Sequence, residues 1–298
     1  MKKDMLSKVQ AYLAYRRALG VQLKNEGRRL LDFGRYAKAR RRVHFTNKLA
    51  ISWACSRRPA DRIYCARSLE IIRPFARHLA MTEPQTQIPP RNILGPAHPR
   101  SSPHLYTPAQ IRLLLNCAGK LSGHLRPHTW QTLISLMACS GLRTSEVIRL
   151  KPCDVDWKQS ALIIRESKGR TRLVPLHRGA MGPLRAYARR RQRLFPLAEY
   201  FFISDTGRPL IAASITFRKL CRGIPYIGRA PRLHDFRHTV ASCVLAKWHS
   251  CGKTVPNRML ILSRFLGHRR VESTYWYLSA FPQLLAEAAQ RFSLDEKP

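Results

Sequence analysis

Acidic residues are scarce in this chain, which has 17 Asp and Glu against 54 Lys and Arg among 298 residues, a formal net charge of +37. Solubility does not require so much charge of one sign, and the folded chain would repel itself unless a polyanion neutralised part of it. A nucleic acid is therefore the expected partner. The charge alone leaves three alternatives open: a ribosomal protein, a membrane-surface protein, and a solvated basic face without a partner.

Long hydrophobic runs and paired cysteines are also missing. No apolar stretch approaches the ~20 residues that a membrane-spanning helix needs, and the N-terminus lacks the apolar core of a signal peptide. The eight cysteines form no CxxC pair and no Cys/His cluster at zinc spacing, which favours small buried residues in a reducing compartment. We therefore expect a soluble cytoplasmic protein, associated with the prokaryotic nucleoid, that binds no metal and no membrane.

Helical periodicity and proline content predict two folded domains joined by a linker. Hydrophobic residues make up 45% of the chain, and a length of ~150 residues for each domain gives two domains. Apolar residues recur at three- and four-residue spacing over 1–81, which predicts a small helical domain whose arginine-rich faces favour contact with a DNA backbone. Six prolines in 82–105 predict an extended linker, and a second domain with a C-terminal tail occupies 106–298.

Cap and turn residues predict the local structure around one arginine and one lysine. An apolar helix over 129–140 ends at Gly141, a suitable left-handed cap, and Arg143 then lies in a tight junction before a short helix that a serine or threonine can cap. Residues 161–165 and 172–175 predict two strands, and Lys168 lies at the tip of the hairpin that joins them. The helix after this hairpin carries arginines at positions 185, 189, 190, 191 and 193.

The second domain contains the residue types needed to cleave a phosphodiester without a metal. Arg143 and Arg237 can bind the two non-bridging oxygens through planar, permanently charged guanidiniums. A tyrosine with its ordinary pKa of about 10 needs a nearby base or positive field to attack at neutral pH, and His234 and His268 can supply both. Lys168 can protonate the departing 5′ oxygen. Orienting such groups around one phosphate can lower the barrier by roughly 7 to 11 kcal/mol.

Several ordered segments resemble the motifs of the tyrosine recombinase, or phage integrase, family. They are GLRTSE at 141–146, ESKGR at 166–170, LHDFRHT at 233–239, and LGH at 266–268 followed by STYWYL at 273–278. The resemblance is specific over about 106–280 and only architectural over 1–81. It implies a helical, SAM-like core-binding domain and a mixed α/β, mainly helical catalytic domain with a small antiparallel sheet.

The resemblance also implies roles for the matching residues. Arg143 and Arg237 would form the phosphate clamp, and His234 and His268 would be its partners. Lys168 would be the general acid. Glu146 is expected to orient the arginine junction, and His238 to give structural support.

Tyr277 matches the nucleophile, because it follows His268 at the spacing of the family, whereas Tyr275 comes two residues early. Residues two apart on a helix point about 200° away from each other, so only one of the two tyrosines can face the phosphate. Tyr275 and Trp276 are expected to pack instead.

A member of this family would be a site-specific DNA recombinase of the integrase or transposase type. It would form a covalent 3′-phosphotyrosine intermediate and exchange strands through a Holliday junction, without a cofactor. Its partners would be double-stranded DNA and further copies of itself, as a tetramer on paired sites. An additional role for other recombinases or DNA-bending proteins stays open.

The two ends of the chain carry further expectations. No arm-binding module is expected before the helical domain. The apolar tail over 284–292 could dock on a neighbouring copy or pack on its own domain.

Two alternatives remain at this point. A type IB-like topoisomerase or resolvase would use the same chemistry without productive exchange, and a non-catalytic basic DNA-binding accessory protein would not need Tyr277. The target DNA sequence stays open, as does the choice between phage integration, transposition, plasmid resolution and gene-cassette movement.

Overall fold

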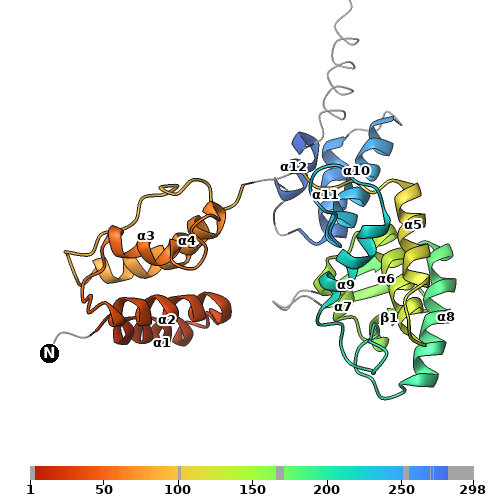
Figure 1. Ribbon diagram of the computed structural model, residues 1–298. Coiled ribbons are helices and arrows are strands. Elements are labelled where there is room, and N and C mark those ends of the chain that lie inside the picture. The colour runs from red at the N-terminus through yellow and green to blue at the C-terminus, as the bar shows by residue number, and fades with distance from the viewer. Residues whose placement is uncertain are drawn as a thin grey trace, which may run out of the picture. The chain divides into compact units, whose positions relative to one another are not determined.

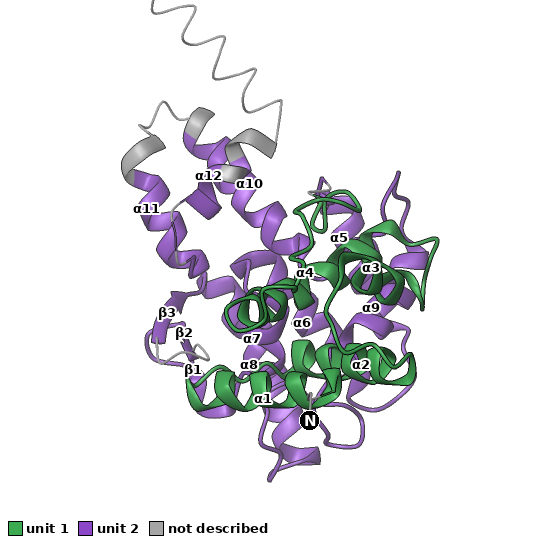
Figure 2. Ribbon diagram, turned by 90° about the vertical axis from the view of Figure 1, so that its left-hand side faces the viewer, with its two compact units in different colours: residues 1–101 green, residues 102–298 purple. Residues whose placement is uncertain are grey.

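The computed structural model describes residues 4–99, 102–165, 171–250, 255–268, 270 and 272–280. The chain forms two compact units, residues 1–101 and 102–298 (Figure 2). The boundary between them falls inside the proline-rich segment. Lys168 and the apolar tail over 284–292 lie outside the described residues. Within the described part of the chain, no helix combines the length and the apolar composition that crossing a membrane requires.

The described residues of the first unit form four helices (Figure 1). They are α1 (Met5–Ala18), α2 (Lys24–Ala39), α3 (Asn47–Cys55) and α4 (Arg62–Ala80). The side chains of Asp4, Thr46 and Asp61 accept hydrogen bonds from backbone N–H groups of the first turn, and so mark where α1, α3 and α4 begin. An aromatic cluster around Phe33 and Phe75 fills the core between the helices.

The proline-rich segment packs against α4. The buried guanidinium of Arg73 donates to the carbonyls of Pro89 and Pro90 at 2.9 and 3.0 Å, and Arg67 donates to the carbonyl of Ala97 at 2.9 Å. Backbone carbonyls in a segment without regular structure need donors from elsewhere, and the arginines of α4 supply them. The segment is non-helical, as its proline content predicts, but this part of it is anchored to the first unit and is not an open spacer.

The second unit is mainly helical with one small sheet. Its described α-helices are α5 (Pro108–Gly119), α6 (Arg126–Ser140), α7 (Thr144–Ile148), α8 (Arg178–Leu194), α9 (Ala213–Leu220), α10 (Asp235–Ser250), α11 (Val255–Leu266) and α12 (Glu272–Ala280). The strands β1 (Val155–Asp156), β2 (Ala161–Arg165) and β3 (Thr171–Pro175) form an antiparallel sheet in the order β1-β2-β3. Within it, Ile163 pairs with Leu173. β2 and β3 match the predicted hairpin, whereas the two residues of β1 are too few to give a periodic pattern.

Helix α6 lies at the centre of the second unit, where α5, α8 and α10 all pack against it (Figure 1). Its buried side chains, among them Trp130, belong to a core that also contains Phe202 and Phe236. Helices α10, α11 and α12 form a smaller hydrophobic cluster that includes Met259 and Tyr277. This second cluster packs α12 against α10 and α11.

The junction between α6 and α7 depends on a glycine and a carboxylate. Gly141 has a φ of +60°, and a Cβ there would lie 3.2 Å from the side chain of Val240. Both the left-handed backbone and the close approach of α10 therefore favour glycine. The N-cap of α7 is Arg143, whose backbone N–H donates to the Glu146 carboxylate at 2.9 Å. The prediction that a serine or threonine caps this helix is therefore wrong.

The cysteines also differ from the expectation. All seven that the structure describes are free, and only Cys65 and Cys221 are buried. The prediction that most are small core residues is wrong, because a single cysteine can lie on either face of a helix and the apolar periodicity around it does not resolve which.

Candidate active site

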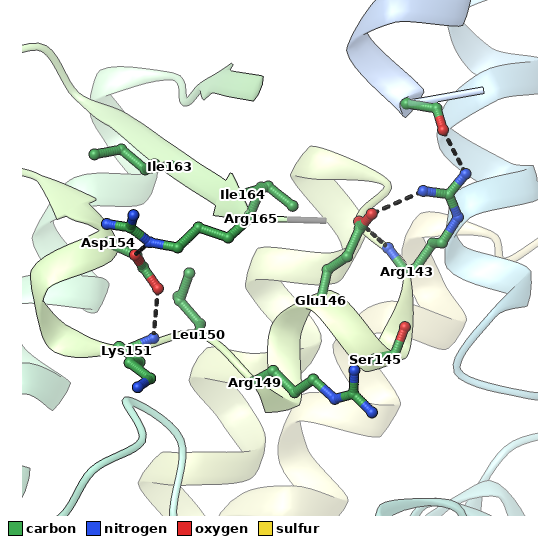
Figure 3. Close-up of a pocket in the computed structure, with 11 residues that line it drawn as sticks. Arg143, Ser145, Glu146, Arg149, Leu150, Lys151, Asp154, Ile163, Ile164 and Arg165 are labelled. Carbon is green, nitrogen blue, oxygen red and sulfur yellow. Dashed lines mark hydrogen bonds and ion pairs between the residues drawn. The ribbon is translucent and has the colours of Figure 1, made fainter. Parts of the chain in front are cut away.

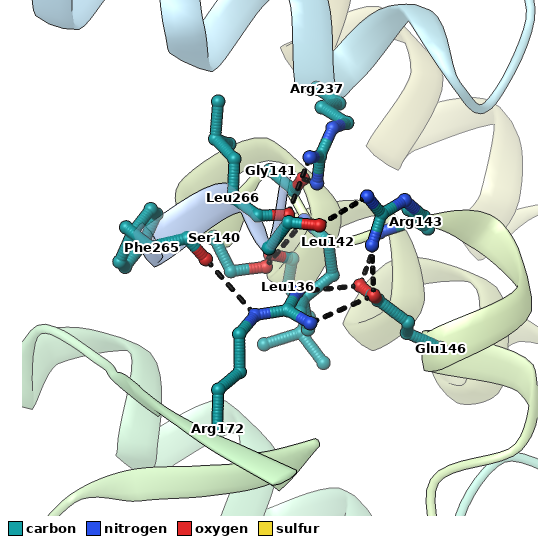
Figure 4. Close-up of polar contacts among 11 residues, drawn as sticks. Leu136, Ser140, Gly141, Leu142, Arg143, Glu146, Arg172, Arg237, Phe265 and Leu266 are labelled. Atoms are coloured by element: carbon teal, nitrogen blue, oxygen red, sulfur yellow. Dashed lines mark hydrogen bonds and ion pairs between the residues drawn. The ribbon is translucent and has the colours of Figure 1, made fainter. Parts of the chain in front are cut away.

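Arg143, Glu146 and Arg172 form a hydrogen-bonded network at the start of α7 (Figure 4). The Arg143 guanidinium lies 2.8 Å from one carboxylate oxygen of Glu146. Arg172 of β3 donates to both oxygens, at 3.0 and 2.9 Å. Burial alone would raise the pKa of Glu146, but the hydrogen bonds from Arg172 and Arg143 outweigh it and lower the pKa. Glu146 therefore stays ionised and ties the sheet to the arginine junction, as its predicted orienting role requires.

The end of α11 holds three arginines through its backbone. The carbonyls of residues 265–267 accept hydrogen bonds from Arg172, Arg237 and Arg143 respectively (Figure 4). The last carbonyls of a helix have no partner within the helix, so these guanidiniums satisfy them. Arg237 also donates to the carbonyl of Gly141 at 3.1 Å. The two predicted clamp arginines therefore lie side by side at the ends of α6 and α11.

The two clamp arginines differ in their access to solvent. Arg237 is 1% exposed, and burial together with the charge of Arg143 lowers the pKa of its guanidinium to about 10. It therefore keeps its charge at neutral pH. The Arg143 side chain is 32% exposed and reaches the surface. A buried and an accessible positive charge next to each other attract an anion that approaches from solvent.

Tyr277 of α12 lies against this arginine pair, with its ring 5.4 Å from that of His238 and 6.1 Å from that of His268. It is 2% exposed, whereas Tyr275 is 46% exposed. Burial raises the pKa of Tyr277, while the charge and hydrogen bonding of Arg237 act in the opposite direction. The phenol is therefore protonated in the free protein. The prediction that Tyr275 packs is wrong, because it is Tyr277 that takes the buried side of this short helix.

Neutral histidines surround the tyrosine. The Nδ1 atom of His268 lies 2.7 Å from the hydroxyl of Thr274, and burial and the charge of Arg237 lower its pKa to about 3. His234 is more exposed and lies 5.1 Å, ring to ring, from His238. Desolvation lowers the pKa of both, to about 4 for His238. All these imidazoles are uncharged at neutral pH and can accept a proton.

A cavity of about 370 Å³ opens beside Arg143, between α7 and the sheet (Figure 3). Its lining includes the basic side chains of Arg143, Arg149, Lys151 and Arg165. Arg165 pairs with the Asp154 carboxylate at 2.8 Å. The excess of basic over acidic groups makes the cavity suitable for an anion.

Most of the predicted site residues come together in the structure, directly or through His238. Those that do so are Arg143, His234, Arg237, His268 and Tyr277. Lys168 falls outside the described residues. Arg172 and Thr274 are not predicted from the sequence. A single arginine in a strand has no distinguishing pattern in so basic a chain, and a threonine one turn before a tyrosine is unremarkable.

Comparison with known proteins identifies relatives of this chain. The phage integrase family model matches residues 106–283. The protein y4rB of Sinorhizobium fredii, named as an integrase/recombinase, is 38% identical over 299 residues, which cover 95% of each chain.

Solved structures of similar fold cover nearly the whole chain. The Tn1549 transposon integrase in complex with transposon right end DNA has a TM-score of 0.71 at 13% identity, covering 98% of this chain and all of its own. A lambda integrase tetramer bound to a Holliday junction has a TM-score of 0.64 at 16% identity, covering 91% of this chain and 76% of its own. At this level of identity the likeness shows a shared fold.

Proposed function

The chain belongs to the phage integrase family, and from this premise we propose that it is a site-specific DNA recombinase that cleaves and rejoins DNA through Tyr277. The observation that carries this conclusion is the position of Tyr277, buried beside Arg237 and flanked by the neutral imidazoles of His238 and His268. A phenol, two guanidiniums and uncharged bases in one place match the needs of a metal-independent attack on a phosphodiester.

Arg143 and Arg237 would hold the scissile phosphate. Arginine guanidiniums stay protonated and present paired N–H groups that fit phosphate oxygens. Hydrogen bonds from both to the non-bridging oxygens would stabilise the additional negative charge of a pentacoordinate transition state. Glu146 and Arg172 would fix the orientation of Arg143 without touching the DNA.

Tyr277 would attack phosphorus with its phenolic oxygen. Because its pKa is raised in the free protein, its proton must pass to a base as the oxygen–phosphorus bond forms. His234 and His268 are the candidate acceptors. A bound phosphate would offset the positive charges of Arg237 and Arg143 that now lower the pKa of His268, and would therefore make this base stronger.

The bond from phosphorus to the 5′ oxygen breaks in the same step, and Lys168 would donate the proton that this oxygen needs. The product is a 3′-phosphotyrosine and a free 5′-hydroxyl. The hydroxyl then attacks the phosphotyrosine of a partner duplex, releases Tyr277 and produces a Holliday junction. One ester bond replaces another at every step, so the exchange needs no ATP.

Two cleaved duplexes require four active sites, so the working assembly would be a tetramer on paired double-stranded DNA sites. The lambda integrase tetramer on a Holliday junction supports this inference by likeness of fold. Residues 1–81 would be the core-binding domain, 82–105 the linker and 106–298 the catalytic domain. The net charge of +37 supports DNA contact by both domains.

Covalent trapping on a nicked suicide substrate, carrying the end sequence of the element that encodes the protein, tests the proposed chemistry. Wild type, Tyr277→Phe and Tyr275→Phe are compared on a denaturing gel, and Tyr275 is a matched control because it lies exposed on the same helix. We expect a protein–DNA band from wild type and Tyr275→Phe and none from Tyr277→Phe.

Other outcomes would favour the alternatives. Loss of the band in Tyr275→Phe alone would overturn the choice of nucleophile, and the absence of any band on DNA that the protein binds would favour an accessory DNA-binding protein. Relaxation of one supercoiled plasmid without recombination between two sites would indicate a type IB-like topoisomerase.

A further inference from the structure

A second basic groove, of about 510 Å³, lies between α6 and α8. Polar side chains from one helix and arginines from the other line it, among them His128, Gln131, Thr132 and Ser135 of α6, and Arg189, Arg190 and Arg193 of α8. Spacings of three and four residues place each set on one face of its helix. The groove shares no lining residue with the cavity beside Arg143.

The three arginines of the groove have no carboxylate partner. Arg189, Arg190 and Arg193 are exposed, and no Asp or Glu in the described part of the chain forms an ion pair with them. Helix α8 contains six arginines and no acidic residue in its 17 positions. Arg191 differs from the groove arginines because it is buried and has a structural partner. Its guanidinium donates to the carbonyl of Tyr200 at 3.1 Å. The side chain of Arg191 is therefore part of the folded interior, whereas the three arginines of the groove are exposed to solvent.

The pKa of His128 depends on the positive charge of this groove. Desolvation and the charge of Arg190 lower its pKa. Like charges on one helix also repel each other, which destabilises α8 slightly unless an anion is present. An anion in the groove would relieve this repulsion and raise the pKa of His128.

The groove is separate from the candidate active site. Helix α8, which carries the arginines of the groove, contributes no residue to the lining of the cavity beside Arg143. The active site adjoins Gly141 at the end of α6, which lies ~9 Å along the helix axis beyond Ser135, the last groove residue of α6. A phosphate held by Arg143 and Arg237 therefore does not occupy the groove.

We propose that the groove between α6 and α8 binds the phosphate backbone of duplex DNA outside the phosphate that the active site holds. Arg189 and Arg193 lie one turn apart, ~6 Å along the helix, a length over which duplex DNA carries about three to four charges. Arginine pairs with phosphate oxygens in bidentate fashion. A recombinase works on two duplexes at once, so DNA beyond the cleaved phosphate is present at high local concentration, which favours DNA over an acidic protein. This last step rests on the proposed function.

The salt dependence of binding to a long duplex tests this proposal. The groove variant is Arg189→Gln/Arg190→Gln/Arg193→Gln, and the control is Arg112→Gln/Lys120→Gln/Lys158→Gln. Both remove three positive charges from exposed positions of the second unit, and a Tyr277→Phe background prevents cleavage. The slope of log K against log salt is negative, and each lost phosphate contact lowers its magnitude by ~0.9. Relative to the Tyr277→Phe protein, we therefore expect the magnitude to decrease by about 2–3 in the groove variant and by less than about 1 in the control.

Equal slopes in the two variants would overturn the proposal. Equal slopes combined with loss of polyglutamate binding in the groove variant alone would assign the groove to an acidic protein partner instead. An unchanged His128 pKa, measured by NMR at saturating duplex, would contradict DNA in the groove as well. Covalent trapping of the wild-type chain on the suicide substrate tests Tyr277 and does not depend on the salt dependence of the groove variant, so failure of this proposal is distinguishable from failure of the proposed chemistry.

Discussion

Replacing Arg172 with alanine would remove the side chain that ties the sheet to the active-site arginines. The side chains of Arg172 and Glu146 are 14% and 9% exposed, so the carboxylate would lose two hydrogen bonds where water has poor access. A hydrogen bond to a charged group contributes about 1.5–3 kcal/mol, and breaking a buried ion pair costs about 3–5 kcal/mol. Because Arg143 remains a partner of Glu146, we expect the free energy of unfolding to fall by about 2–3 kcal/mol.

Urea unfolding followed by circular dichroism measures this change, with Arg165→Ala as the control. Arg165 also lies in the sheet and pairs with a carboxylate, but its side chain is 61% exposed, so its loss should cost less than about 1 kcal/mol. A double-mutant cycle of Arg172→Ala with Glu146→Gln should give a coupling of about 1 kcal/mol or more. The rate of covalent trapping should also fall, because Glu146, which orients Arg143, would lose the two hydrogen bonds that tie it to the sheet.

Two results would refute this reasoning. Equal losses of stability in Arg172→Ala and Arg165→Ala would mean that burial of the network does not strengthen it. Additive effects of Arg172→Ala and Glu146→Gln would mean that the two side chains do not stabilise each other.

Two further predictions concern the α6 end and the histidines. Gly141→Ala should lower the free energy of unfolding by about 1–2 kcal/mol from its left-handed backbone alone. Gly182→Ala, where nothing lies within 4 Å of the added methyl, should be neutral or stabilise by up to about 1 kcal/mol, and similar urea curves for the two would contradict this. His268 has a pKa of about 3 in the folded protein, below the ~6.5 of an unfolded chain, so the folded state binds fewer protons and stability should fall as the pH is lowered from about 7 towards 3. His268→Gln should flatten this pH dependence, and a profile identical to that of wild type would count against a lowered pKa.

Local signals in the sequence predict much of the second unit. Gly141 ends α6 in the left-handed conformation that its residue type predicts, and the short apolar runs in 161–165 and 172–175, joined by a turn, correctly predict the strands β2 and β3. The two-residue spacing of Tyr275 and Tyr277 predicts that only one faces the site, and their exposures differ accordingly. These features depend on residues that are close in the chain, which is why the sequence alone is sufficient for them.

Features that depend on distant residues are not predictable in this way. Arg172 meets Glu146 and the carbonyl of Phe265 only because β3 folds against α7 and α11, and nothing near Arg172 in the sequence indicates either partner. The proline-rich segment has a composition typical of an open linker, yet Arg73 of α4 binds its carbonyls. In both cases a long arginine side chain finds its acceptor through tertiary structure.

The three arginines at the end of α11 also have an energetic consequence. Bringing guanidiniums together is unfavourable, because like charges repel more strongly where water is excluded. Here the partial negative charge at the C-terminus of a helix, together with Glu146, offsets this repulsion before any DNA arrives. The electrostatic cost of bringing the three guanidiniums together is therefore met when the protein folds. A phosphate that enters the site meets a preorganised arrangement that does not have to form around it.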